Sequence, residues 1–364
     1  MSLQNMNSQS DSTSPVERAS LRAYVDEVER RRHVSLAALT ALLTTTDTDV
    51  VRYLFDRALS TVRLHYGTSV FMRGLIEISS YCRNDCRYCG IRRSRTTLHR
   101  YRLSTADILR SCEEGYAAGM RTFVLQGGED PWFTDERLCR LVEEVASRYP
   151  DCAVTLSMGE RSEESYRRLF EAGARRYLLR HETADPLHYA YLHPADMSFD
   201  HRMNCLASLK KLGYQVGCGF MVGSPGQTME TLYRDLLFVE TFQPHMVGIG
   251  PFVATQDTPF ADEPNGSVER TVRLVALLRL ILPHALLPAT TALGSLHPLG
   301  RERALRAGAN VVMPNISPVS SRKLYTIYDN KICLTDGVDH CFSCLQGRVG
   351  GVGRQLVVDR GDYR

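Results

Sequence analysis

The sequence contains no long apolar run and no block of charges of one sign. Its longest uncharged apolar stretch, Leu280 to Leu293, contains two prolines, and it is shorter than the ~20 residues that a membrane-spanning helix needs. Acidic and basic residues are interspersed, and the formal net charge is only +3. We therefore expect no membrane span, and no nucleic acid as the main partner. The N-terminus does not combine a basic start with an apolar core, so we expect no secretory signal and a cytoplasmic protein.

Cysteine, in contrast, is abundant, with 11 in a chain of 364 residues. An odd number of cysteines in a reducing compartment argues against a disulfide framework and favours metal or redox chemistry. Six of them form two groups along the chain, which are Cys82, Cys86 and Cys89, and Cys333, Cys341 and Cys344.

Most of the chain alternates between short apolar runs and amphipathic helical patterns. Residues 1–20 are polar and predicted to be a disordered tail, and 21–70 are predicted to form an N-terminal helical segment. Eight strand candidates follow, at 74–80, 122–128, 153–159, 176–183, 214–223, 246–252, 286–292 and 310–315. Strands alternating with helices at this spacing favour parallel pairing through right-handed crossovers.

Eight such units predict an α/β fold, a (β/α)8 TIM-type barrel over 71–316. The segment 21–70 would cap it, and 317–364 would form a C-terminal lid that carries the second cysteine group. In such barrels the carboxyl ends of the strands carry the chemistry, and the unusual residues lie there in this sequence. An open doubly wound sheet is the alternative fold.

The first cysteine group has the spacing C-x3-C-x2-C directly after the first predicted barrel strand, with Tyr88 before the third cysteine. Thiolates select zinc, copper(I) or iron–sulfur clusters. Three protein ligands leave one metal position open, as a catalytic site requires. A zinc site completed by a distant ligand and three unrelated core cysteines are the alternatives.

This motif resembles the signature of the radical S-adenosylmethionine (SAM) superfamily. The resemblance implies a 4Fe–4S cluster held by Cys82, Cys86 and Cys89, with SAM bound at the open iron. It also implies reductive cleavage of SAM to a 5′-deoxyadenosyl radical. The protein would position the reactants and exclude water, while the cofactors supply the chemistry.

Further strand ends would bind SAM. By the resemblance, Gly127, Gly128 and Glu129 receive its amino group, and glycine allows close approach of the backbone. Arg180 offers a bidentate fork for its carboxylate, and Glu182 can accept from the ribose hydroxyls. Arg180 and Glu182 are two residues apart, so a strand would direct both to one side, whereas His181 would pack.

Two further residues complete the expected cofactor site. Tyr88 lies within the cysteine loop, and Met221 lies on a glycine-rich strand candidate that would line the adenine. Glycines in a strand indicate close approach by a ligand or a bend of the barrel.

The second cysteine group, Cys333-x7-Cys341-x2-Cys344, lies in a polar, turn-rich stretch. Exposed thiols of this kind favour metal ligation. We interpret them as ligands of an auxiliary iron–sulfur cluster, either 2Fe–2S or 4Fe–4S. His340, water or an exogenous ligand could be the fourth ligand, and a zinc knuckle is the alternative.

From about residue 35 to 345 the chain resembles the HydE family, the radical SAM maturases of FeFe-hydrogenase. The resemblance rests on the order and spacing of joined motifs: CRNDCRYCGIRR, LQGGED, RHETADP, GFMVGSPGQT, MVGIGPF, LLPATTALG, GANVVMPN and C-x7-C-x2-C. It implies action on an iron complex that carries cysteine, carbon monoxide and cyanide, with HydG and HydF as partner maturases and ferredoxin or flavodoxin as reductant. The implied substrate chamber is lined by Thr290, Thr291, Met313, Tyr325 and Tyr328.

Three alternatives remain at this point. A biotin synthase or a methylornithine synthase would share the barrel, although the ligands of a second barrel cluster, as in biotin synthase, are incomplete here. Outside the enzymes, a non-enzymatic iron–sulfur or zinc scaffold that passes clusters or electrons would need neither Gly-Gly-Glu, nor the Arg180–Glu182 pair, nor a sealed barrel.

Overall fold

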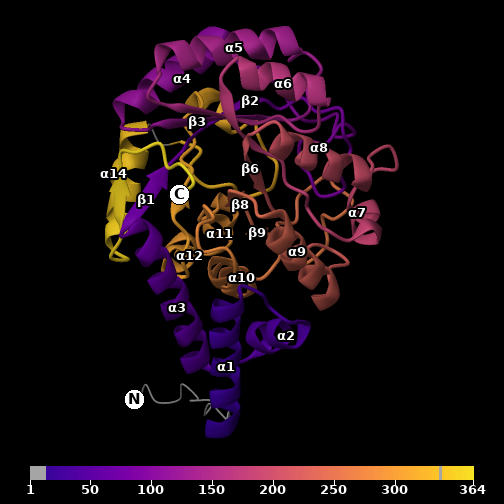
Figure 1. Ribbon diagram of the computed structural model, residues 1–364. Helices are drawn as coiled ribbons and strands as arrows, with labels where there is room; N and C mark the ends of the chain where they lie inside the picture. Colours follow the sequence, from indigo (N-terminus) through magenta and orange to yellow (C-terminus); the bar gives the residue numbers. More distant parts are fainter. Residues whose placement is uncertain (1–13, 336–337) are drawn as a thin grey trace, which may run out of the picture.

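Parallel strands joined by helices surround the centre of the structure (Figure 1). The computed structural model describes residues 14–335 and 338–364. The strands are β1 (Ser69–Met72), β2 (Gly74–Ser79), β3 (Thr122–Gly127), β4 (Ala153–Ser157), β5 (Ala174–Leu178), β6 (Gln215–Cys218), β7 (Met221–Val222), β8 (Met246–Val247), β9 (Gly250–Pro251), β10 (Val311–Val312) and β11 (Gln355–Val357). The helices are α1 (Pro15–Arg31), α2 (Leu36–Thr44), α3 (Thr48–Tyr66), α4 (Thr105–Ala117), α5 (Asp135–Arg148), α6 (Glu163–Glu171), α7 (Pro186–Leu192), α8 (Phe199–Lys211), α9 (Met229–Phe242), α10 (Val268–Ile281), α11 (Thr291–Leu296), α12 (Gly300–Arg306), α13 (Val319–Arg322) and α14 (Val338–Gly350).

The main sheet has the order β2-β3-β4-β5-β6-β8, with every pair parallel. Neighbouring strands in this sheet follow one another in chain order, whereas in a doubly wound sheet the strand order reverses part-way across the sheet. Isolated parallel bridges continue the ring, joining Met246 to Leu286, Pro288 to Val311, and Asn315 to Leu75. The predicted (β/α)8 barrel is therefore confirmed.

Several strand candidates are shorter than predicted or divided in two. The candidate at 176–183 ends at Leu178, and the candidate at 246–252 is divided into β8 and β9. Residues 286–292 contribute only bridge residues, and Thr291 already begins helix α11. Proline lacks the N–H that a ladder needs, which accounts for the weak pairing around Pro288. The candidate at 214–223 is divided into β6 and β7 at Gly219, where a Cβ atom would lie 2.0 Å from the carbonyl oxygen of Gly248.

Hydroxyl side chains start several of the barrel helices. Ser104, Thr134, Ser162 and Ser267 each accept a hydrogen bond from a backbone N–H in the first turn of α4, α5, α6 or α10. These bonds satisfy donors that a helix N-terminus leaves unpaired. They fix the residue at which each strand-to-helix loop ends and the helix begins. The loops that carry polar residues at the carboxyl ends of the strands therefore have defined lengths.

The N-terminal segment is more regular than its composition indicates. Helix α1 begins at Pro15, not at Leu21, because Ser14 accepts from the backbone N–H of Glu17 and proline suits the first helical position. The predicted disordered tail is thus wrong for residues 15–20, and 1–13 lie outside the described residues. Helices α1 to α3 extend away from the barrel and pack on α10 (Figure 1).

The end of the chain returns to the barrel. Strand β11 pairs with β1, which the sequence did not predict, and α14 lies beside them (Figure 1). Residues 360–362 then reach the N-terminal ends of the barrel strands, where the carbonyl oxygen of Arg360 accepts from Thr122 and Arg176. Within the described residues, no helix is both long and apolar enough to cross a membrane.

Candidate functional site

The loop after β2 is held in shape by its own polar side chains. Asp85 accepts hydrogen bonds from Arg92 Nε at 2.8 Å and from the backbone N–H of Ser94 at 3.0 Å. The Arg92 guanidinium holds the pKa of the Asp85 carboxyl far below its usual range, helped by Ser94. Arg100 donates to the carbonyl oxygens of Ile91 and Arg92. The loop is therefore fixed before any ligand binds.

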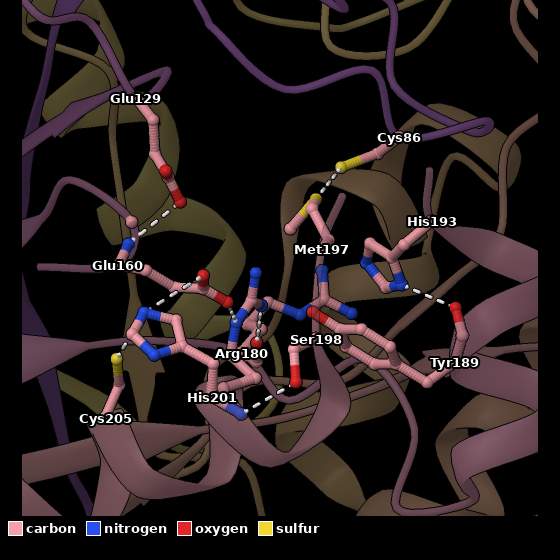
Figure 2. A network of polar contacts seen from close by, with 12 residues as sticks. Cys86, Glu129, Glu160, Arg180, Tyr189, His193, Met197, Ser198, His201 and Cys205 are labelled. Carbon is pink, nitrogen blue, oxygen red and sulfur yellow. Dashed lines mark hydrogen bonds and ion pairs between the residues drawn. The ribbon is translucent and has the colours of Figure 1, made fainter. Parts of the chain in front are cut away.

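This fixed loop presents the three thiols of the first cysteine group together. Burial, with a smaller contribution from the neighbouring Cys82 thiol, raises the pKa of Cys89 to about 12. Burial and the other two thiols raise the pKa of Cys86 in the same way. Cys86 Sγ lies 3.7 Å from Met197 Sδ (Figure 2). Thiols that are this reluctant to ionise become thiolates on binding a cationic metal centre.

A cavity of about 370 Å³ opens beside Cys82 and Cys89 and runs into the barrel. Its size is in the range of small-molecule sites. The predicted residues that line it are Cys82, Tyr88, Cys89, Gly127, Gly128, Glu129, Arg180, Glu182, Met221, Thr290, Thr291, Met313, Tyr325 and Tyr328. A wider hollow of about 510 Å³ lies outside the barrel between the β3 and β4 ends, shares only Glu129 with it and contains no cysteine. The inner cavity is the candidate site.

The Gly-Gly-Glu turn packs directly on the cysteine loop. A Cβ atom on Gly128 would lie 2.3 Å from the carbonyl oxygen of Tyr81 and 2.7 Å from Cys82 Cβ. The carboxylate of Glu129 accepts from the backbone N–H of Glu160 at 2.8 Å (Figure 2) and from Arg83 Nε at 3.0 Å. Only glycine allows this approach, which places the turn beside the first cysteine.

Arg180 and Glu182 share the cavity, but not by strand alternation. Strand β5 ends at Leu178, and Glu182 has φ +65°, held by its backbone N–H donating to the carbonyl of Gly219. Arg180 Nη2 lies 3.2 Å from Glu182 Oε2, and the buried Arg180 Nε has no hydrogen-bond partner among the described residues. That donor is available to an anionic ligand. His181 is buried, as expected of a packing residue.

Tyr88 joins the cysteine loop to helix α7. Its hydroxyl lies 3.2 Å from His193 Nε2. Figure 2 shows His193 beside Tyr189, on whose ring the imidazole stacks. Burial lowers the pKa of His193 to about 3, so this imidazole is neutral at physiological pH. The contact anchors Tyr88 against a rigid element of the barrel.

The deeper part of the cavity contains buried hydroxyl groups, one of which has no partner among the described residues. Tyr325 is 2% exposed, and its hydroxyl accepts from Gln126 Nε2 at 3.4 Å. Thr290 is the N-cap of α11, yet its side chain makes no capping bond, and its buried Oγ1 has no partner among the described residues. Buried polar groups normally have partners, so the Thr290 hydroxyl is available to a ligand in the cavity.

Sequence reasoning missed three charged residues that line the same cavity. Arg202 on α8 donates to the carboxylate of Glu160 and to the carbonyl oxygen of Arg180. Glu77 on β2 forms an ion pair with Lys331. The only sequence signal for Glu77 and Arg202 was a charged residue at a position where the apolar pattern of the strand or helix predicts a buried side chain.

The second cysteine group is only partly described. Cys333 is half-buried with φ +63°, and Cys344 is exposed on α14. Cys341 lies in α14, but its side chain, like that of His340, is outside the described residues. Their role as ligands of an auxiliary cluster stays a prediction.

Comparisons with known proteins agree with this geometry. The model of the radical SAM superfamily matches residues 76–239. The FeFe-hydrogenase maturase subunit HydE of Thermotoga maritima is 43% identical over 334 residues, which cover 92% of this chain and 95% of that protein. The chain belongs to the HydE family of radical SAM proteins.

Relatives outside the HydE family are more distant. A 3-methylornithine synthase of Methanosarcina acetivorans is 30% identical over 286 residues, covering 78% of this chain and 80% of that protein. The crystal structure of methylornithine synthase has a TM-score of 0.80 at 27% identity, covering 92% of this chain and 97% of that one. The methylornithine synthase crystal structure therefore shares the barrel of this chain.

Membership of the superfamily implies a 4Fe–4S cluster and SAM as the cofactors. The described residues fit them. Three soft ligands lie on one fixed loop, a glycine turn packs against Cys82 so closely that a Cβ atom would clash with the cysteine loop, and Arg180 keeps a buried donor for a carboxylate.

Proposed function

We propose that this protein is a radical SAM maturase that acts in assembly of the FeFe-hydrogenase active-site cluster. The proposal depends on one observation: the cysteine loop and the polar groups at Thr290, Tyr325 and Tyr328 open into a single cavity inside the barrel. A radical formed at one end would meet a substrate held at the other, away from bulk water. The 43% identity to HydE supports the same function.

The cofactor end of the cavity would be organised by residues that already hold fixed positions. Cys82, Cys86 and Cys89 would hold a 4Fe–4S cluster that keeps one coordination position for SAM, and the two cofactors together would supply a 5′-deoxyadenosyl radical. The backbone of Gly127 and Gly128 and the carboxylate of Glu129 bind the amino group of SAM. Arg180 would bind its carboxylate through the unpaired Nε, and Glu182 its ribose.

Two residues would enclose the nucleoside part of SAM. Met221 is 6% exposed on β7 and lines the cavity, so its thioether offers an apolar, polarisable contact for adenine. Tyr88, anchored through His193, would limit the space at the cysteine loop.

The substrate end would hold an iron complex that carries cysteine, carbon monoxide and cyanide. Hydroxyls of Thr290, Thr291, Tyr325 and Tyr328 offer donors to an anionic complex, and Met313 adds an apolar wall. The complex would come from HydG and the product would go to HydF, with ferredoxin or flavodoxin as reductant. An auxiliary 2Fe–2S or 4Fe–4S cluster on Cys333, Cys341 and Cys344 belongs to the same proposal.

The test is anaerobic reconstitution of the full chain with iron and sulfide, followed by SAM and dithionite. We expect 5′-deoxyadenosine from the wild type and only background from Cys86→Ala, because a cluster on two thiolates lacks a ligand. Cys139→Ala is the matched control, since Cys139 is half-buried on α5 away from the cavity. Equal yields from Cys86→Ala and the wild type, or zinc at the three thiols, would exclude the proposal.

Complementation distinguishes a maturase from the related synthases. Expression of this chain in a strain that lacks its own HydE should restore hydrogenase activity, and Cys86→Ala should not. Formation of 5′-deoxyadenosine without restored hydrogenase would leave a radical SAM enzyme of another specificity, such as a methylornithine synthase.

A further inference from the structure

The wall of the cavity contains an ion pair that the proposed roles do not use. Glu77 lies on β2 with its side chain 1% exposed, and Lys331 lies between α13 and α14 with its side chain 7% exposed. Lys331 Nζ donates to Glu77 Oε1. Both residues line the cavity together with Tyr325 and Tyr328.

Neighbouring groups hold the pair in place without saturating it. Asn315 Nδ2 donates to Glu77 Oε2 at 2.7 Å, and Lys331 Nζ donates to the carbonyl oxygen of Tyr325 at 3.2 Å. An ammonium has three donors and each carboxylate oxygen can accept more than one hydrogen bond. One N–H of Lys331 and acceptor positions on Glu77 therefore remain for a group in the cavity.

Stability alone is a poor reason for such a pair. Removing two charges from water costs several kcal/mol per ion, and apolar replacements of buried pairs are often neutral or stabilising. The rest of this end of the cavity uses neutral groups, the hydroxyls of Thr290, Tyr325 and Tyr328 and the thioether of Met313. A cation and an anion side by side in a neutral wall match a ligand that itself carries both charges.

We propose that Glu77 and Lys331 bind the α-amino and α-carboxylate groups of an amino-acid-derived substrate. The carboxylate accepts the remaining N–H of Lys331, and the amino group donates to Glu77, which Asn315 keeps oriented. The inference rests on the proposed function, because it names the part of the substrate that the chamber recognises. Tyr325 contributes to this site twice, since its carbonyl oxygen accepts from Lys331 and its side chain lines the cavity.

The probe for this site is S-methyl-L-cysteine, whose thioether competes weakly for the cluster iron. Its two truncated analogues are 2-(methylthio)ethylamine, which lacks the carboxylate, and 3-(methylthio)propanoate, which lacks the amino group. Calorimetric titration of the reconstituted, SAM-loaded full chain should show binding of S-methyl-L-cysteine at least tenfold tighter than of either analogue.

The variants then assign each contact. Lys331→Met should weaken the binding of S-methyl-L-cysteine about tenfold or more, to the affinity of 2-(methylthio)ethylamine, while Lys331→Arg should retain the preference for a probe with a carboxylate. Glu77→Gln should lower the affinity for S-methyl-L-cysteine to that for 3-(methylthio)propanoate. Lys323→Met is the control, because Lys323 is exposed just after α13 and should leave all three affinities unchanged.

Each other outcome counts against the inference. If the pair only closed the cavity, Lys331→Met and Glu77→Gln would each lower the affinities for all three probes by the same factor. Absence of binding of S-methyl-L-cysteine to the wild type, or unchanged discrimination in both variants, would overturn the site. Formation of 5′-deoxyadenosine by the same wild-type preparation separates these results from failure of the proposed function.

Discussion

At the scale of single residues, Gly128 shows how closely the cysteine loop and the SAM turn are packed. Gly128→Ala would place a Cβ atom 2.3 Å from a backbone oxygen that has no room to move aside. Overpacking of this kind costs about 1–3 kcal/mol, and here the strain falls on the residue that carries the first thiol. We expect a severalfold loss of cluster iron and of SAM cleavage, measured by iron analysis and 5′-deoxyadenosine yield.

The control for Gly128→Ala is Gly347→Ala. A Cβ atom on Gly347 would meet nothing within 4 Å, and the residue lies inside α14, where alanine favours the helix. Cluster content should therefore match that of the wild type. A Gly128→Ala protein with full iron content and full SAM cleavage would show that the turn does not constrain the loop.

The residues of the site differ in how far the sequence could predict them. Cys82, Cys86 and Cys89 form a local pattern, and so does the Gly-Gly-Glu turn, because each function depends on neighbours in the chain. Glu77 and Lys331 are 254 positions apart, so no local pattern relates them. Burial and pairing of distant charges are properties of the folded barrel, and only coordinates reveal them.

At the scale of elements, the segment that carries Tyr325 and Lys331 rests on the cysteine loop. The backbone N–H of Gly90 donates to the carbonyl oxygen of Ile327 at 2.9 Å, and a Cβ atom on Gly90 would lie 2.0 Å from the carbonyl oxygen of Thr326. Gly90→Ala should displace this segment and admit water and oxygen to the cavity. We expect the cluster absorbance of the reconstituted protein to bleach severalfold faster in air than that of the wild type.

Gly350→Ala serves as the comparison, because a Cβ atom there would have open space. The same bleaching rate in Gly90→Ala and Gly350→Ala would mean that the segment does not limit access to the cavity.

Element boundaries show why the order of strands was predictable and their lengths were not. The alternation of apolar runs and amphipathic helices predicted the barrel, because in every unit the helix must bury its apolar face against the strands. The ladders are interrupted at Pro288 by a missing donor and at Gly219 by a close backbone approach, and β5 ends before Glu182, which has a positive φ. Pro288 and Glu182 line the cavity, where function requires departures from regular pairing.

At the scale of the whole molecule, the two ends of the barrel are closed in different ways. The cavity end is covered by the segment that contains Tyr325 and Lys331, whereas the opposite end is closed by the last residues of the chain. There Asp362 pairs with Arg176, and the carbonyl oxygen of Gly361 accepts from Arg73. Both arginines are buried, and burial lowers the pKa of each.

This arrangement predicts that Asp362 stabilises the barrel by compensating a buried guanidinium charge. Asp362→Asn keeps the shape but removes the only carboxylate in contact with Arg176 among the described residues. Losing one partner of a fully buried pair costs about 3–5 kcal/mol. Because the Asp362 side chain is 40% exposed and water screens it, we expect the free energy of unfolding to fall by roughly 1–2 kcal/mol, and the Tm to fall by about 2 °C for each kcal/mol.

Differential scanning calorimetry measures the shift in Tm, with Asp56→Asn on the exposed face of α3 as the control. An unchanged Tm in Asp362→Asn would mean that the chain end covers the barrel without neutralising it, and that the hydrogen bonds from Arg176 to Thr122 and to the carbonyl oxygen of Arg360 suffice for this guanidinium.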